Sequence, residues 1–175
     1  AGGVAATVGV GFEDFNATIA AISPFFASGS DAGTSFKTML LALIPKSGDA
    51  ATAMQNLGLI TADGSNQFFD AAGNMKSMGE ITGILNTALS GLSEEQKNEA
   101  LATIFGTDAM RAAAAIGKLT EEQFGTLKST IGDTDAEVSA AKRMNTLSGV
   151  MEIMWGVVDT LKLQIGDKFL PIVRK

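Results

Sequence analysis

The sequence predicts an all-α protein with several short helices and one small loop or hairpin, followed by a long C-terminal helix with coiled-coil character. Three observations predict this class: apolar residues recur at helical spacing, capping residues begin most segments, and no stretch has the pattern of a sheet. The pattern divides the chain into a helical core segment, residues 1–134, and a long amphipathic helix, residues 135–175.

A proline and an apolar face define the first predicted helix. Residues 13–22 form the first predicted helix, which stops before Pro24 because the residue before a proline avoids helical geometry. We expect this helix to bury one apolar face, made of Phe12, Phe15, Ile19 and Ile22.

Two more helices follow before residue 59. The second begins near Ser30 or Asp31, residues that cap helices well, and is closed by the next proline. The third begins at Ser47 or Asp49 and ends at Gly58. Residues 59–76 contain turn signals at Asp63-Gly64 and at residues 72–74, so they predict a small hairpin or an ordered loop, with another helix over residues 77–89.

Two later helices begin with the same phrase, "LSEEQ" and "LTEEQ". In each, the hydroxyl of Ser93 or Thr120 caps the helix, and the amide of Gln96 or Gln123 reaches back to the cap. The glutamates between them lie at the positive end of the helix dipole. These capping boxes predict where helices begin and carry no functional content.

The last part of the chain has the spacing of a coiled coil. Apolar or small residues recur in steps of four and three over about four heptads, on a helix about 45 Å long. This stripe fits a self-association seam and, equally well, the buried face of an ordinary helix of the same domain. The positions are Ala140, Met144, Leu147, Met151, Met154, Val158, Leu161 and Ile165.

The amino-acid composition argues against most kinds of catalytic and metal-binding site. The 175 residues include no cysteine and no histidine, which removes disulfides, thiolate nucleophiles, the usual zinc sites and the commonest general base. The net charge of −6 disfavours binding to nucleic acid or anionic lipid. Three of the four carboxylate pairs lie at helix starts, where capping explains them, and the Asp63-Gly64 turn lacks the order of a calcium loop. We therefore predict no catalytic residue, no cofactor and no metal site.

Three stretches resemble a known family when taken in order. They are "LGLITADG" at 57–64, "LSEEQKNEALATIFGTDAMRAAAAI" at 92–116 and "LKLQIGDKFLPIV" at 161–173. Together they resemble the core region of tail tape measure proteins of long-tailed bacteriophages and prophages, of the TP901-1-like group. Such proteins are long, so we interpret this chain as a fragment; a complete processed chain is the alternative. The motif positions are Leu57, Gly58, Asp63, Gly64, Leu92, Ser93, Ile104, Phe105, Gly106, Ile165, Gly166 and Pro171.

The resemblance implies a structural protein of the virion, without enzymatic activity. Copies would lie in the lumen of the tail tube, having assembled in the host cytoplasm, would set tail length, and would leave on infection. It implies association with further copies, with a trimer as the first expectation. Other implied partners are the tail tube and tail tip proteins, the tail assembly chaperones and, on ejection, the host envelope, with no sequence-specific nucleic acid binding. Two other classes stay open: a helical adaptor or toxin-like binding module, and a cell-wall hydrolase.

The IFG stretch then acts as a packing device. We expect Ile104 and Phe105 to be buried and Gly106 to end the helix in the left-handed conformation. Thr107 or Asp108 would cap the helix that follows.

Overall fold

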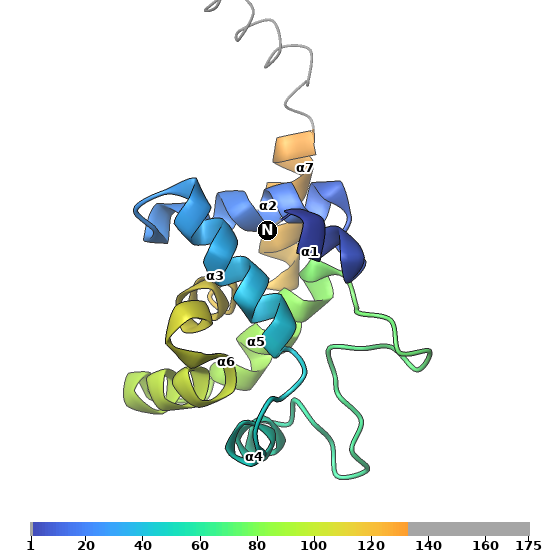
Figure 1. Ribbon diagram of the computed structural model, residues 1–175, viewed down its shortest axis with the longest axis vertical. Coiled ribbons are helices and arrows are strands. Elements are labelled where there is room, and N and C mark those ends of the chain that lie inside the picture. Colours follow the sequence, from blue (N-terminus) through green and yellow to red (C-terminus); the bar gives the residue numbers. More distant parts are fainter. Residues whose placement is uncertain (1, 133–175) are drawn as a thin grey trace, which may run out of the picture. The chain divides into compact units, whose positions relative to one another are not determined.

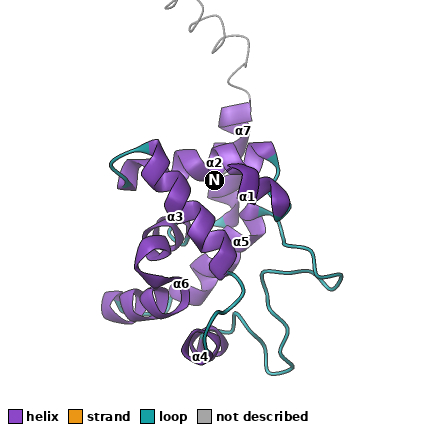
Figure 2. Cartoon of the chain, in the orientation of Figure 1, coloured by secondary structure: helices purple, strands orange, loops and turns teal. Residues whose placement is uncertain are grey.

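The computed structural model describes residues 2–132 and contains, within them, seven α-helices and no strand (Figures 1 and 2). The all-α prediction is confirmed. In order, the elements are α1 (Gly2–Thr7), α2 (Phe12–Ile22), the 3₁₀ helix η1 (Ser23–Phe25), α3 (Gly29–Ala42), α4 (Gly48–Asn56), α5 (Met78–Leu89), α6 (Glu94–Ile116) and α7 (Glu121–Gly132). The predicted coiled-coil seam and the motif residues Ile165, Gly166 and Pro171 lie outside the described residues.

The core is organised around α3 and α6, which share the most extensive contact in the unit. Both helices bury small residues, such as Ala32 on α3 and Ala112 on α6, so their backbones can approach closely. The Ser35 hydroxyl of α3 donates a hydrogen bond of 2.5 Å to the Asp108 carbonyl of α6. Helix α4 packs on α6 as well, while α7 packs on α2 and α5.

The predicted capping boxes are present. In the first, the Ser93 amide donates to the Gln96 side chain at 2.9 Å and the Gln96 amide donates to the Ser93 hydroxyl at 3.3 Å. Thr120 and Gln123 form the same pair of bonds at 2.9 and 3.2 Å. Ser47 caps α4, one of the two alternatives that the sequence offered.

Helix α4 ends as predicted next to Gly58. The Gly58 amide donates to the Gln55 carbonyl at 3.0 Å, and the Leu59 amide donates to the Met54 carbonyl at 2.8 Å. These two bonds are the Schellman arrangement, which satisfies carbonyls that a helix end leaves unpaired.

The start of α3 and the buried face of α2 differ from the prediction. Ser28 caps α3 through a bond from the Asp31 amide, so Ser30 and Asp31 already lie inside the helix. Phe12 is wrong as a core residue, because it is 79% exposed at the first position of α2. The buried residues of α2 are Asp14, Ala17, Thr18 and Ile22.

Helix α1 was not predicted, because its glycines obscured the helical pattern. The helix ends in the same way as α4: the Gly9 amide donates to Ala6 at 3.2 Å and the Val10 amide donates to Ala5 at 2.9 Å. Ala5 and Val10 are both buried in the core.

The break in α6 lies at Gly106, as the sequence predicts, but its geometry differs. Gly106 has φ 72° and ψ 173°, so φ is positive while ψ is extended rather than left-handed helical. Only glycine adopts this region readily. Within the described residues, neither Thr107 nor Asp108 makes a side-chain cap; instead the Asp108 carbonyl accepts from Ser35.

Residues 59–76 form an ordered arm of two turns that projects from the helices (Figure 1). Isolated antiparallel bridges close the turns, one from Ile60 to Asn66 and one from Phe69 to Met75. Both turns contain a glycine with positive φ at the same position. The arm is anchored by the fully buried Phe68 and by Asn66, whose amide donates to the Leu43 carbonyl at 2.8 Å.

Candidate interaction surfaces

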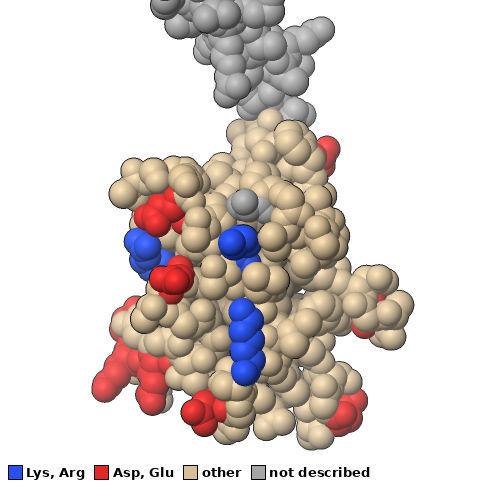
Figure 3. All heavy atoms as spheres, in the orientation of Figure 1, with Lys and Arg blue, Asp and Glu red and all other residues tan. Residues whose placement is uncertain are grey.

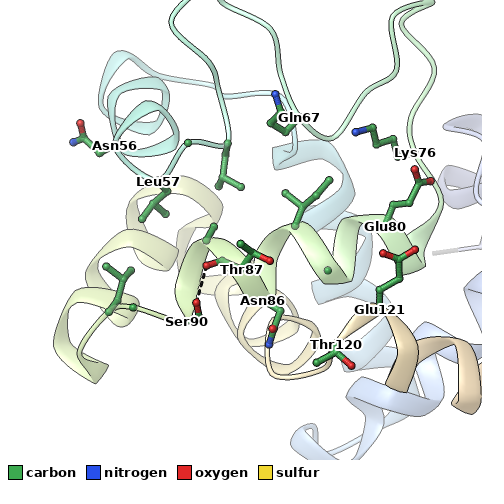
Figure 4. A pocket seen from close by; sticks show the side chains of 17 residues that line it. Asn56, Leu57, Gln67, Lys76, Glu80, Asn86, Thr87, Ser90, Thr120 and Glu121 are labelled. Atoms are coloured by element: carbon green, nitrogen blue, oxygen red, sulfur yellow. Dashed lines mark hydrogen bonds between the residues drawn. The ribbon is translucent and has the colours of Figure 1, made fainter.

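An open groove of about 910 Å³ runs along α5 (Figure 4). The end of α4 and the arm form one wall, and the beginning of α7 forms the other. Its lining mixes amide and hydroxyl side chains with a few apolar ones. The residues labelled in Figure 4 are Asn56, Leu57, Gln67, Lys76, Glu80, Asn86, Thr87, Ser90, Thr120 and Glu121.

Charged side chains gather at one end of the groove, where Lys76, Glu80 and Glu121 lie near one another (Figure 4). Glu80 accepts hydrogen bonds from the Ser77 hydroxyl at 2.7 Å and the Ser77 amide at 3.0 Å. These bonds lower the pKa of Glu80, with the bond from the Ser77 hydroxyl as the larger cause. Because general acids at neutral pH need a raised pKa, Glu80 is poorly suited to donate a proton.

The groove brings together three of the family-motif positions. Leu57 and Gly58 lie at the end of α4, and Leu92 lies in the turn before α6, yet all three line the groove. The other motif residues lie elsewhere: Ile104 and Phe105 are buried in the core. Ser93 caps α6, and Asp63, Gly64 and Gly106 have structural positions in a turn and a helix break.

The arm and the segment that follows α3 line another open hollow, of about 710 Å³. Ile44, Pro45, Ile60 and Phe69 provide an apolar part of its lining, and Ile44 is 60% exposed. Exposed apolar side chains at the edge of a hollow are typical of contact surfaces, although scattered ones occur on any protein.

Each turn of the arm is held by an aspartate. Asp63 accepts from the hydroxyls of Thr61 and Ser65, and the bond from Thr61 is the larger cause of the lowered pKa of Asp63. Asp70 accepts from the Asn74 side chain at 3.1 Å and the Asn74 amide at 2.8 Å, which lowers the pKa of Asp70. These carboxylates therefore rigidify the turns.

Cations stack on the aromatic rings that follow α2. The Arg111 guanidinium lies 4.6 Å from the centre of the Phe26 ring and 3.8 Å from the Asp31 carboxylate. The Lys118 ammonium lies 5.6 Å from the centre of the Phe25 ring. Sequence reasoning missed these pairs, because the partners lie about 90 residues apart along the chain.

Asp14 has a role that the sequence did not indicate. It is buried, with 9% of its surface exposed, and its Oδ2 accepts from the Met78 amide at the start of α5 at 3.1 Å. Its Oδ1 pairs with the Lys128 ammonium of α7 at 2.7 Å, and this hydrogen bond is the largest cause of the raised pKa of Lys128. One carboxylate thus joins three helices.

Within residues 2–132, no three acidic side chains are placed to hold a metal ion. No helix in the same range is long and apolar enough to cross a membrane.

Comparison with known proteins decides the family. The phage-related minor tail protein family matches residues 1–106, more than half of the chain. The chain belongs to this family. A tape measure protein of Pneumococcus phage Dp-1 is 25% identical over 174 residues, which cover 98% of this chain but 14% of that protein's own length. No solved structure matches the chain. This minor tail protein chain therefore spans a small part of the much longer relative.

Proposed function

We propose that this chain is a segment of a tape measure protein, which lies in the lumen of the phage tail tube and sets the length of the tail. The observation that carries the proposal is the similarity to a named tape measure protein along 98% of the chain. The family match in residues 1–106 supports the coarser role in a phage tail independently.

The charge distribution supports a chain that DNA can pass without binding. Residues 133–175 contain six acidic and six basic side chains, so the whole net charge of −6 falls within residues 1–132. On the face drawn in Figure 3, basic side chains lie apart from one another, some near the centre and another at the left edge between acidic ones, and they form no continuous basic patch. A nucleic-acid site needs a larger basic surface, usually with aromatic side chains among the cations.

The carboxylates support a function without catalysis. Among the described residues, Asp63, Asp70, Glu80 and Glu94 have lowered pKa values, each because of hydrogen bonds from neighbouring side chains. A cell-wall hydrolase needs one carboxyl with a raised pKa to protonate its leaving group. The environments of these four residues favour the opposite.

The proposal includes partners. Further copies of the chain, with three as our expectation, would associate along the seam in residues 140–165, and the tail tube and tail tip proteins would surround them. Tail assembly chaperones would bind before assembly in the host cytoplasm, and the host envelope would be contacted on ejection. The Met-rich composition also suits the alternative of a helical adaptor, which would stay monomeric until its partner is added.

A duplication in the encoding phage or prophage tests the measuring role. Repeating residues 138–165 in frame adds 28 residues, which preserve the heptad phase and lengthen a helical chain by about 42 Å. Tails measured by negative-stain electron microscopy should lengthen by that amount, and two added copies should double the increase. Unchanged tail length with intact virions would contradict the measuring role.

A further inference from the structure

The groove along α5 has an apolar floor and a definite length. Its partly buried apolar side chains pack on the core and leave their remaining surface to the groove; they include Leu57, Ile84, Ala88 and Leu92. The lining runs along α5 from Glu80 to Leu92, which is about 18 Å at the rise of a helix. An extended chain advances about 3.3–3.6 Å per residue, so this length takes about five extended residues.

Polar groups that suit a peptide backbone also line the groove. Within residues 2–132, the amide of Gln67 and the hydroxyl of Thr87 form no hydrogen bond. The Asn86 amide nitrogen donates to the Gly117 carbonyl at 2.9 Å, which leaves the Asn86 side-chain oxygen as an acceptor. Donors and acceptors beside apolar contacts are what an extended segment needs, because its main chain provides affinity and its side chains provide specificity.

Charge at one end of the groove sets the direction of an occupant. Glu80 and Glu121 lie at that end together with Lys76 (Figure 4), and neither glutamate forms an ion pair within the described residues. The lining of the opposite end, at Ser90 and Leu92, is uncharged. The groove therefore favours an apolar segment that is followed by basic residues, with the basic residues at the glutamates.

We propose that the groove binds residues 169–175 of a second copy of the chain. This segment, which lies outside the described residues, reads "FLPIVRK", five apolar residues followed by two basic ones. Five extended residues span about 17 Å, which matches the groove. Arg174 and Lys175 then lie at Glu80 and Glu121, and the net charge of −6 in residues 1–132 attracts them.

The sequence of the segment suits an extended occupant. The residue before Pro171 avoids helical geometry, and the β-branched Ile172 and Val173 favour an extended backbone. The predicted helix over residues 135–165, about 45 Å long, precedes the segment, which favours the groove of a second copy over that of the same chain. Because the segment of one copy enters the groove of the next, the contact is heterologous and continues in an open series. It does not use the seam in residues 140–165, so each can fail without the other.

Disulfide trapping tests this contact in the full 175-residue chain, which has no cysteine of its own. One copy carries Ser90→Cys and the other carries Lys168→Cys, positions that the proposal brings together at the uncharged end of the groove. Ser30, an exposed serine of α3 outside the groove, provides the control as Ser30→Cys. We expect the Ser90 pair to form a disulfide at least about tenfold faster than the Ser30 pair, because binding raises the local concentration of the thiols. Equal rates overturn the proposal.

Two adjacent glutamates test the role of charge. Glu121 lines the groove and Glu122 does not, although both are exposed in the first turn of α7. Glu121→Lys and Glu122→Lys therefore change the net charge and the start of the helix alike. We expect Glu121→Lys to slow trapping by at least about threefold and Glu122→Lys to leave it unchanged. Equal effects of the two variants contradict the proposed contact.

A single chain with both Ser90→Cys and Lys168→Cys identifies which copy supplies the segment. We expect dimers and higher species linked by disulfides, in an amount that rises with protein concentration. A disulfide within one chain, formed at a rate independent of concentration, overturns the assignment to a second copy.

Discussion

Replacing Gly106 by alanine tests whether the break in α6 is set by backbone geometry. Gly106 has φ 72° and ψ 173°, and a Cβ atom there would have no neighbour within 4 Å. Any cost of Gly106→Ala therefore comes from the backbone and not from a clash. Residues held in this region cost about 1–3 kcal/mol, so we expect unfolding free energy to fall by that amount.

Thermal and urea unfolding, followed by circular dichroism at 222 nm, measure this change. A loss of about 1–3 kcal/mol corresponds to a melting temperature lower by about 3–10 °C for a unit of this size. Gly125 provides the matched control, because it lies within α7, has no positive φ and also leaves open space for a Cβ. Gly125→Ala should stabilise by about 0.5–1 kcal/mol, the usual gain in a helix interior. If both variants change stability in the same direction, the assigned geometry of Gly106 is wrong.

Three further changes have measurable outcomes. Asp14→Asn removes the ion pair with Lys128 and should lower the free energy of unfolding in urea by about 1–3 kcal/mol. Because the pKa of Lys128 is raised, the stabilisation by this ion pair should be present at neutral pH and lost above pH about 10.5. The Lys128→Met variant should not show that loss of stability at high pH. Glu80 has a lowered pKa, so its contribution is present above about pH 4.5 and lost as pH falls, and Glu80→Gln should flatten the acid side of the stability profile. Met151→Asp combined with Val158→Asp places charges in the predicted seam and should reduce self-association, measured by sedimentation velocity. If the wild type is monomeric at all concentrations and the variant unfolds, the predicted oligomer is refuted.

Local signals in the sequence predicted most helix boundaries correctly. Capping boxes and closing glycines work through bonds between residues three to five positions apart, so the information lies in a short stretch. The same explanation covers the error at α3, where "ASGSD" offers several capping residues in a row and Ser28 is the one with extended backbone. The capping box of Ser77 and Glu80 was recognisable in the same way but was missed.

The repeated geometry of the arm was only partly predictable. The sequence showed turn residues at Asp63-Gly64 and at 72–74, and these predicted a hairpin or a loop. Two bridges with the same spacing, nine residues apart, emerge only when backbone pairing is known. The sequence does not reveal the anchor either, because Phe68 and Phe69 are adjacent and the structure buries only the first completely.

Contacts between distant segments explain what the sequence could not predict. Glu13 and Asp14 both look like acids at the start of a helix, where the dipole favours them. The structure separates them: Asp14 is turned inwards by two partners, the Met78 amide and the Lys128 ammonium, which lie 64 and 114 residues away. A buried carboxylate without such partners would be strongly unfavourable, so the position of α7 determines whether Asp14 can stay where it is. A single acidic residue in the second helix therefore couples the packing of the unit to the helix from which the rest of the chain continues.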